Sequence, residues 1–98
     1  MMDVYLQALT GKIFKILPSF EENPDNSRRY VKLLNCELIG VADLFPLLKE
    51  QVDFIDIMSI VSFLANDDSY ELPTCRQLVF TAIERVKRLQ TQIIDEEE

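Results

Sequence analysis

Asp53 and Asp56 are the residues whose types and spacing come closest to a chemical site. They lie one helical turn apart in the stretch DFIDIMSIVSFLA, where paired carboxylates can hold a hard cation. A helix-borne metal site also needs matching carboxylates from a facing helix. The candidates, Glu37 and Asp43, project about 120° apart around a helix axis. We therefore predict that Asp53 caps a helix with Asp56 as its companion, and that the chain holds no metal.

The residues that usually carry catalysis and cofactor binding are missing or isolated. The chain contains no histidine, which removes the commonest general base, the usual zinc ligand sets and histidine-dependent nucleophilic triads. Cys36 and Cys75 alone cannot complete a structural zinc site, and the isolated Gly11 and Gly40 form no phosphate-binding loop. The segment 66–71 lacks the central glycine of a calcium loop. The sequence predicts no catalytic residue and no cofactor.

Two groups of basic residues recur along the chain. The members of each share one short helical stretch: Arg28, Arg29 and Lys32 in the first group, and Arg85, Lys87 and Arg88 in the second. We interpret the first group as a solvated face beside acidic neighbours, with an anion site as the open alternative. The second group is the natural complement of the acidic stretch 49–72, within one chain or between two.

The net charge is −7, from 17 acidic and 10 basic residues, and it is concentrated in residues 49–72. Such a chain repels the phosphate backbone, so we expect no direct nucleic-acid binding. The same charge raises an alternative, in which the protein is an acidic mimic or inhibitor that occupies a basic site on a nucleic-acid-binding partner.

The expected location is cytoplasmic. Residues 4–17 are interrupted by polar side chains and are followed by no small-residue cleavage site, so we expect no signal peptide. No run approaches the roughly 20 apolar residues of a membrane span. Cys36 and Cys75 both sit in apolar segments and are expected to be small core residues rather than a disulfide.

Helical periodicity is found in four segments. In the first, apolar residues step by three and four: Leu6, Leu9, Ile13, Ile16 and Phe20. We expect Pro18 and the polar stretch after it to end this helix. The second helix is expected to begin with Asn23 as its cap and Pro24 at its first position, and to end before Pro46.

The second helix is apolar on two sides. One stripe contains Tyr30, Val31, Leu34, Leu38, Val41 and Phe45, and the nearly opposite stripe contains Leu33, Cys36, Gly40 and Leu44. A helix that is apolar on two faces needs two neighbours.

The third helix, over residues 53–65, is polar only at every third residue and is therefore predicted to be buried over most of its circumference. For the fourth, a capping box at Thr74 and Gln77 predicts the start. Its apolar seam has heptad spacing: Cys75, Val79, Ala82, Val86, Leu89 and Ile93.

These elements predict an all-α protein, a small antiparallel four-helix bundle in one domain over residues 1–94, with a frayed acidic tail at 95–98. We expect a cytosolic protein-interaction module without catalytic activity that associates with a second copy of itself, although a compact monomer would also account for the apolar faces. The predicted interface comprises Leu33, Cys36, Gly40, Leu44, Ile60 and Leu64. The alternatives are the acidic mimic and a small all-helical enzyme acting on an anionic metabolite.

Overall fold

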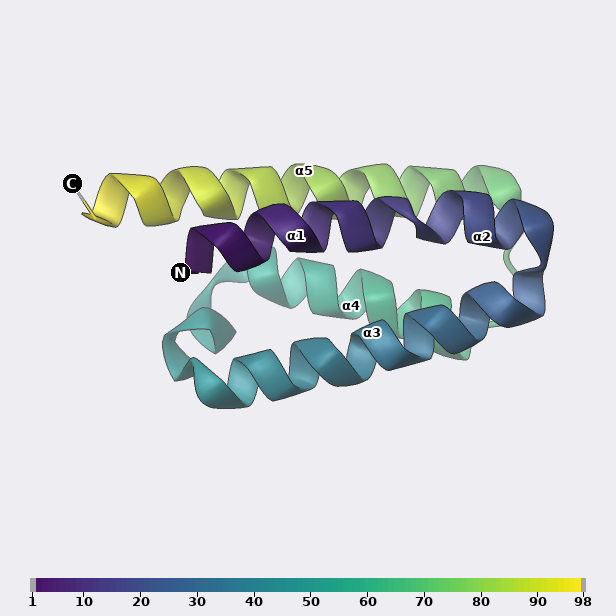
Figure 1. Cartoon of the computed structure of the whole chain (residues 1–98), viewed down its shortest axis with the longest axis horizontal. Coiled ribbons are helices and arrows are strands. Elements are labelled where there is room, and N and C mark those ends of the chain that lie inside the picture. The colour runs from purple at the N-terminus through teal and green to yellow at the C-terminus, as the bar shows by residue number, and fades with distance from the viewer. Residues whose placement is uncertain (1, 98) are drawn as a thin grey trace.

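The structure is a computed structural model that describes the backbone of residues 2–97 and the side chains of residues 3–92. Within the described backbone the chain forms helices and no strands, which confirms the all-α class (Figure 1). The elements are α1 (Met2–Phe14), α2 (Ile16–Glu22), α3 (Pro24–Leu44), the short 3₁₀ helix η1 (Pro46–Glu50), α4 (Val52–Asn66) and α5 (Leu72–Glu97).

Four helical rods run alternately in opposite directions around one core. The helices α1 and α2 follow one another as a single rod, α3 returns beside α2, α4 runs back along α3, and α5 lies along both α4 and α1 (Figure 1). The molecule measures 42 × 22 × 19 Å. Both long outer helices, α3 and α5, therefore have one face against the core and another turned away from it.

The first rod contains a break at Lys15, and Pro18 explains it. Proline has no N–H, so the carbonyl of Phe14 loses its helical partner, and the ring also crowds that carbonyl. The helix resumes at once, with Ser19 N–H donating to the Lys15 carbonyl at 3.2 Å, and continues to Glu22. Pro18 itself therefore does not end the rod, but the polar stretch after it does, as predicted, because α2 stops at Glu22. The predicted apolar seam is confirmed, because all five of its residues are buried.

The predicted boundaries of α3 are confirmed. The side-chain oxygen of Asn23 accepts hydrogen bonds from the backbone N–H groups of Asp25 and Asn26, at 3.0 and 3.4 Å, and Pro24 occupies the first helical position. The helix ends at Leu44, because the residue before Pro46 is pushed out of the helical region.

The prediction that α4 is buried over most of its circumference holds only in part, because Val52, Ile55 and Phe63 lie exposed along one side of the helix. Phe54, Ile57, Val61 and Leu64 are fully buried.

The predicted N-cap, Asp53, is wrong. The cap is Gln51, at the end of η1, and Asp53 lies inside the first turn. The short helix η1 feeds directly into α4, so the helix starts before the aspartate that local chemistry favours as a cap.

The predicted seam of α5 is confirmed from Cys75 to Leu89, all of whose members are fully buried. The capping box is wrong, because α5 begins at Leu72 and Thr74 lies within its first turn. The side chain of Ile93 lies outside the described residues. The backbone is helical to Glu97, where a frayed tail from residue 95 was expected, and Glu98 lies outside the described residues.

Candidate interaction surface on α3

The most exposed apolar stripe predicted from the sequence lies on the outer side of α3. At about 100° per residue, the buried residues Val31, Leu34, Leu38 and Ala42 gather on one face of this helix. On the opposite side, Leu33 is 72% exposed and Leu44 is 76% exposed. Cys36 and Gly40 lie between them and are also exposed. We call Leu33, Cys36, Gly40 and Leu44 the outer stripe of α3.

The two predicted interface residues of α4 do not join this stripe. Leu64 is fully buried in the core of the single chain, where a second copy cannot reach it. Ile60 is half-buried and packs against the same core. The periodicity of the α4 segment marks these positions as apolar but gives no information on which neighbour covers them, and here the neighbours belong to the chain itself.

Among the described residues, none packs against Gly40 closely enough to require a glycine there. A Cβ atom added at Gly40 would meet no atom within 4 Å, and the same holds for Gly11. Glycine in a helix costs roughly 1 kcal/mol relative to alanine, because it orders a more flexible backbone. The described part of the chain therefore gives no steric reason for a residue without a side chain at the centre of the outer stripe.

The two cysteines have different surroundings. Cys75 is buried in the seam of α5, and burial raises the pKa of its thiol to about 11. Cys36 is exposed on the outer stripe, and both thiols are free. The prediction that both are core residues is confirmed for Cys75 and wrong for Cys36.

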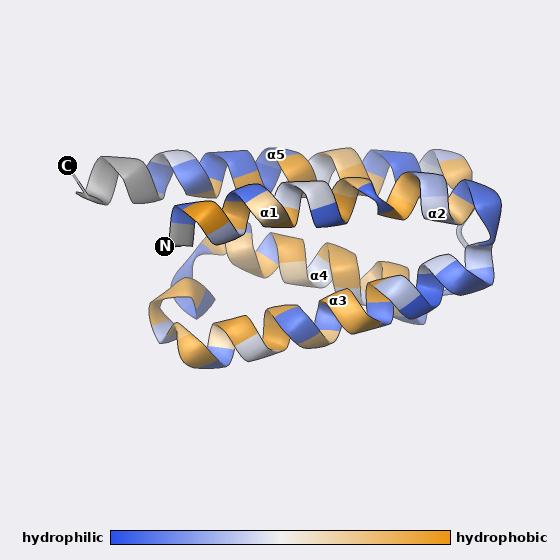
Figure 2. Ribbon diagram, in the orientation of Figure 1, coloured by the Kyte–Doolittle hydropathy of each residue, from blue (hydrophilic) through white to orange (hydrophobic). Residues whose placement is uncertain are grey.

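Other apolar side chains outside the stripe are exposed in α3, η1 and α4, and their exposure was not predicted from the sequence. Leu47 in η1 and Val52 at the start of α4 are exposed, as are Ile39 and Ile55. Figure 2 shows hydrophobic residues gathered along the C-terminal half of α3 and around the turn into η1. Of the two leucines that follow Pro46, Leu47 is exposed and Leu48 is buried in the core, and local spacing does not distinguish them.

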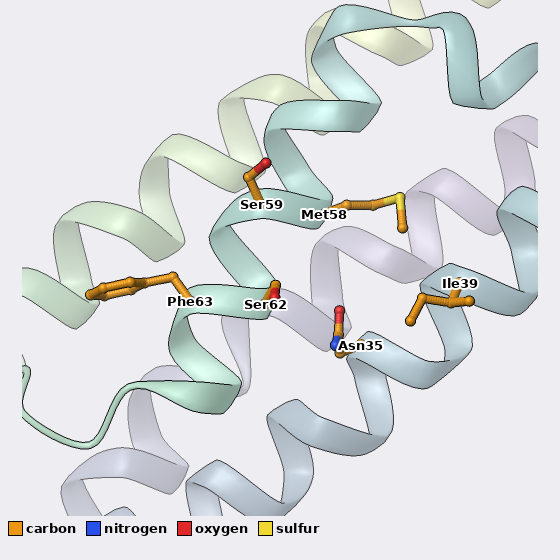
Figure 3. Close-up of a pocket in the computed structure, with 6 residues that line it drawn as sticks. All are labelled: Asn35, Ile39, Met58, Ser59, Ser62 and Phe63. Carbon is orange, nitrogen blue, oxygen red and sulfur yellow. The ribbon is translucent and has the colours of Figure 1, made fainter.

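A shallow groove of about 530 Å³ lies beside this surface, between α3 and α4. Its lining is uncharged and consists of Asn35, Ile39, Met58, Ser59, Ser62 and Phe63 (Figure 3). A second groove, of about 270 Å³, contains one lysine, Lys15, and one carboxylate, Glu22. The enzyme alternative requires at least two basic side chains converging with a carboxylate, and neither groove provides this set.

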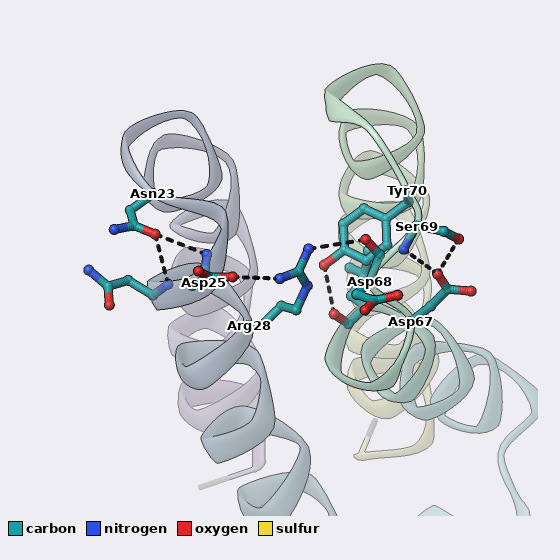
Figure 4. A network of polar contacts seen from close by, with 9 residues as sticks. Asn23, Asp25, Arg28, Asp67, Asp68, Ser69 and Tyr70 are labelled. Carbon is teal, nitrogen blue, oxygen red and sulfur yellow. Dashed lines mark hydrogen bonds and ion pairs between the residues drawn. The ribbon is translucent and has the colours of Figure 1, made fainter.

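Arg28, from the first basic group, ties the start of α3 to the connector between α4 and α5 (Figure 4). One guanidinium nitrogen lies 2.8 Å from Asp25 Oδ1, and another donates to the Asp68 carbonyl at 3.2 Å. In the same connector, the Tyr70 hydroxyl donates to the Leu64 carbonyl at 2.6 Å. Arg28 therefore stabilises the packing of this connector against α3. Arg29 and Lys32 are the exposed members of the first basic group.

The second basic group faces the acidic segment within the same chain. Arg85 Nε lies 3.2 Å from Asp56 Oδ2, and Arg88 Nη2 lies 3.8 Å from Asp53 Oδ1. These contacts confirm the predicted complementarity and place it between α5 and α4. They also neutralise two of the carboxylates on which the acidic-mimic alternative depends.

Glu37 links α3 to α1 in a cluster that the sequence did not predict. It accepts hydrogen bonds from the Tyr5 hydroxyl at 2.9 Å and from Lys12 Nζ at 2.8 Å. Burial and the nearby Glu37 carboxylate raise the pKa of Tyr5. Partial burial alone would raise the pKa of Glu37, but the two hydrogen bonds and the charge of Lys12 outweigh it and lower this pKa. These contacts link α3 to α1.

Among the described residues, no three cysteine or acidic side chains gather as metal ligands would. No described helix combines the length and the apolar character needed to cross a membrane. No protein-family model, no curated protein and no solved structure matches this chain.

Proposed function

We propose that this protein is a small cytosolic interaction module that associates with a second copy of itself through the outer stripe of α3. One observation carries the proposal: Leu33 and Leu44 are mostly exposed and lie on the same side of α3, while the opposite side of this helix is buried in the core. Exposed apolar side chains that share one face of a small domain favour an interaction site, whereas singly scattered ones do not. Leu47 and Val52, in the η1 turn and at the start of α4 that follow this helix, are also exposed.

The state of the cysteines supports the cytosolic part of the proposal. Cys36 is an exposed free thiol, and Cys75 is a buried one. Exposed thiols persist in reducing compartments, whereas secreted domains of this size usually pair their cysteines.

Light scattering at a dilute and a concentrated loading tests the proposal. The chain has a mass of 11.4 kDa, and we expect the measured mass to approach twice this value at the higher loading. Leu44→Glu should restore the single-chain mass, because a carboxylate would be buried without a partner in the interface. A single-chain mass at both loadings for the unmodified protein would refute self-association.

A matched control separates this surface from general exposure. Val4, on α1, is 68% exposed and lies outside the outer stripe. Val4→Glu adds the same charge to an exposed apolar position, so it should leave the association unchanged. If Val4→Glu and Leu44→Glu weaken the association equally, the effect comes from net charge and not from the α3 surface.

A further inference from the structure

We infer that the two copies meet in antiparallel orientation, with α3 of one chain along α3 of the other and a two-fold axis passing near the middle of the helix. The inference rests on the proposed function, because it specifies how two copies meet. Its basis is the spacing of exposed side chains on α3, where three different pairs of residues share nearly the same midpoint.

The leucines define the first pair. Leu33 and Leu44 are eleven residues apart, which is about three turns and leaves them about 20° apart around the helix. Across a two-fold axis, each contact between different residues occurs twice. In an antiparallel pair centred between the leucines, Leu33 of each chain therefore packs against Leu44 of the other, and both side chains leave water.

The charges define the second pair and decide the direction. Lys32 and Asp43 are also eleven residues apart and lie on one edge of the same exposed surface. The two-fold axis keeps both on the same edge, so Lys32 of each copy approaches Asp43 of the other. Asp43 is exposed and uses Oδ1 in a 3.0 Å pair with Lys49. A parallel two-fold pair would place Lys32 of one copy and Asp43 of the other at different heights and on opposite edges, so it would make neither of these contacts.

The third pair lies at the centre. Cys36 and Gly40 have their midpoint in the same turn, so Cys36 of one chain faces Gly40 of the other. Small residues at a helix crossing let the two axes come close. The open space around Gly40 within the single chain is then the space that the second copy fills.

Disulfide cross-linking tests the direction and the register. The unmodified chain, with its exposed Cys36, is mixed with an isotope-labelled Cys36→Ser/Gly40→Cys chain and oxidised with diamide. Diamide accepts two electrons and two protons as two thiols become one disulfide. Cys75 is buried and stays in both chains. The antiparallel geometry brings the thiols at positions 36 and 40 within disulfide reach only in the mixed dimer, so the mixed species should exceed either symmetric species several-fold.

A predominance of symmetric disulfides would overturn the inference in favour of a parallel pair. Light scattering of the same mixture distinguishes a failure of the antiparallel geometry from a failure of self-association. A dimer mass without the mixed disulfide rejects the antiparallel geometry and leaves self-association intact. A single-chain mass rejects the proposed function as well.

Charge reversal gives an independent test. Lys32→Glu and Asp43→Lys should each weaken association roughly fivefold, because each change creates two like-charge contacts per dimer. The combined variant restores opposite charges and should return the association to within about twofold of the unmodified chain. Lys87→Glu, on the exposed side of α5, is the matched control and should have no comparable effect. A combined variant no better than its single changes would overturn the inference.

Discussion

The outward faces of α3 and α5 differ, although both helices are long and both bury an apolar seam in the same core. Exposed residues of α5 include Arg76, Gln77, Glu84 and Lys87, and its exposed Phe80 packs edge-on against Phe14 at 6.5 Å between ring centroids. The outer stripe of α3 consists of leucine, cysteine and glycine. In the described part of α5 the exposed side is mostly polar, whereas the outer stripe of α3 carries two exposed leucines.

The largest expected effect on stability comes from comparing a buried and an exposed leucine of α3. Leu38 is fully buried and Leu33 is mostly exposed. Leu38→Ala should lower the free energy of unfolding by about 2–5 kcal/mol, since it removes buried methyl groups and leaves a cavity. Leu33→Ala should change it by less than about 0.5 kcal/mol. Urea denaturation followed by circular dichroism, at a concentration where the chain is single, measures both. Equal losses would mean that Leu33 is buried within the single chain.

The glycines extend the comparison to α1. Gly11→Ala and Gly40→Ala should each raise the free energy of unfolding by up to about 1 kcal/mol, because alanine favours the helix and its Cβ meets nothing at either site. The two variants serve as controls for each other in the same urea experiment. A loss of stability for Gly40→Ala alone would show that another part of the chain covers this position.

On α5, Arg85 makes an ion pair with α4, whereas Lys87 is exposed to solvent. Arg85→Met should cost up to about 1 kcal/mol, because it leaves Asp56 without its 3.2 Å partner. Lys87→Met should be nearly neutral, since Lys87 is exposed and makes no ion pair within the described part of the chain. Thermal unfolding midpoints report the difference, and equal midpoints would contradict a stabilising role for the α4–α5 ion pair.

The smallest expected effect is the pH dependence from Glu37. Its pKa is lowered from 4.5 in the folded chain, so its contribution is complete above this value and is lost as the pH falls through the lowered pKa. The gain should stay below about 1 kcal/mol, because the Glu37 and Lys12 side chains are 36% and 41% exposed and water screens them. The stability difference between the unmodified chain and Glu37→Gln should therefore shrink below pH 4.5. A constant difference across this range would reject the role of the Glu37 charge.

Much of the fold could be predicted from the sequence because helical periodicity is a local property. The seams of α1–α2 and α5, the Asn23 cap and the end of α3 before Pro46 all follow from residues a few positions apart. The predicted helix boundaries were wrong where a neighbouring segment overrode the preference of a single residue. Pro18 broke a hydrogen bond without stopping the rod, and the turn of η1 started α4 ahead of Asp53.

The candidate surface was only partly predictable. The sequence identifies Leu33, Cys36, Gly40 and Leu44 as a second apolar stripe, but periodicity does not say whether a stripe meets solvent or another helix. For the same reason Leu64, which was predicted at the interface, is part of the core. The hydrogen bonds from Tyr5 to Glu37 and from Arg28 to the Asp68 carbonyl join residues far apart in the chain, so no local sequence pattern predicts them.

The sequence by itself determined the helices and their apolar sides, because backbone hydrogen bonds and side-chain spacing act within a few turns. Only the tertiary structure decided which apolar side became core and which stayed exposed, because burial depends on the neighbour that each face meets. In α3 the bundle covers Leu38 and leaves Leu33 and Leu44 in water.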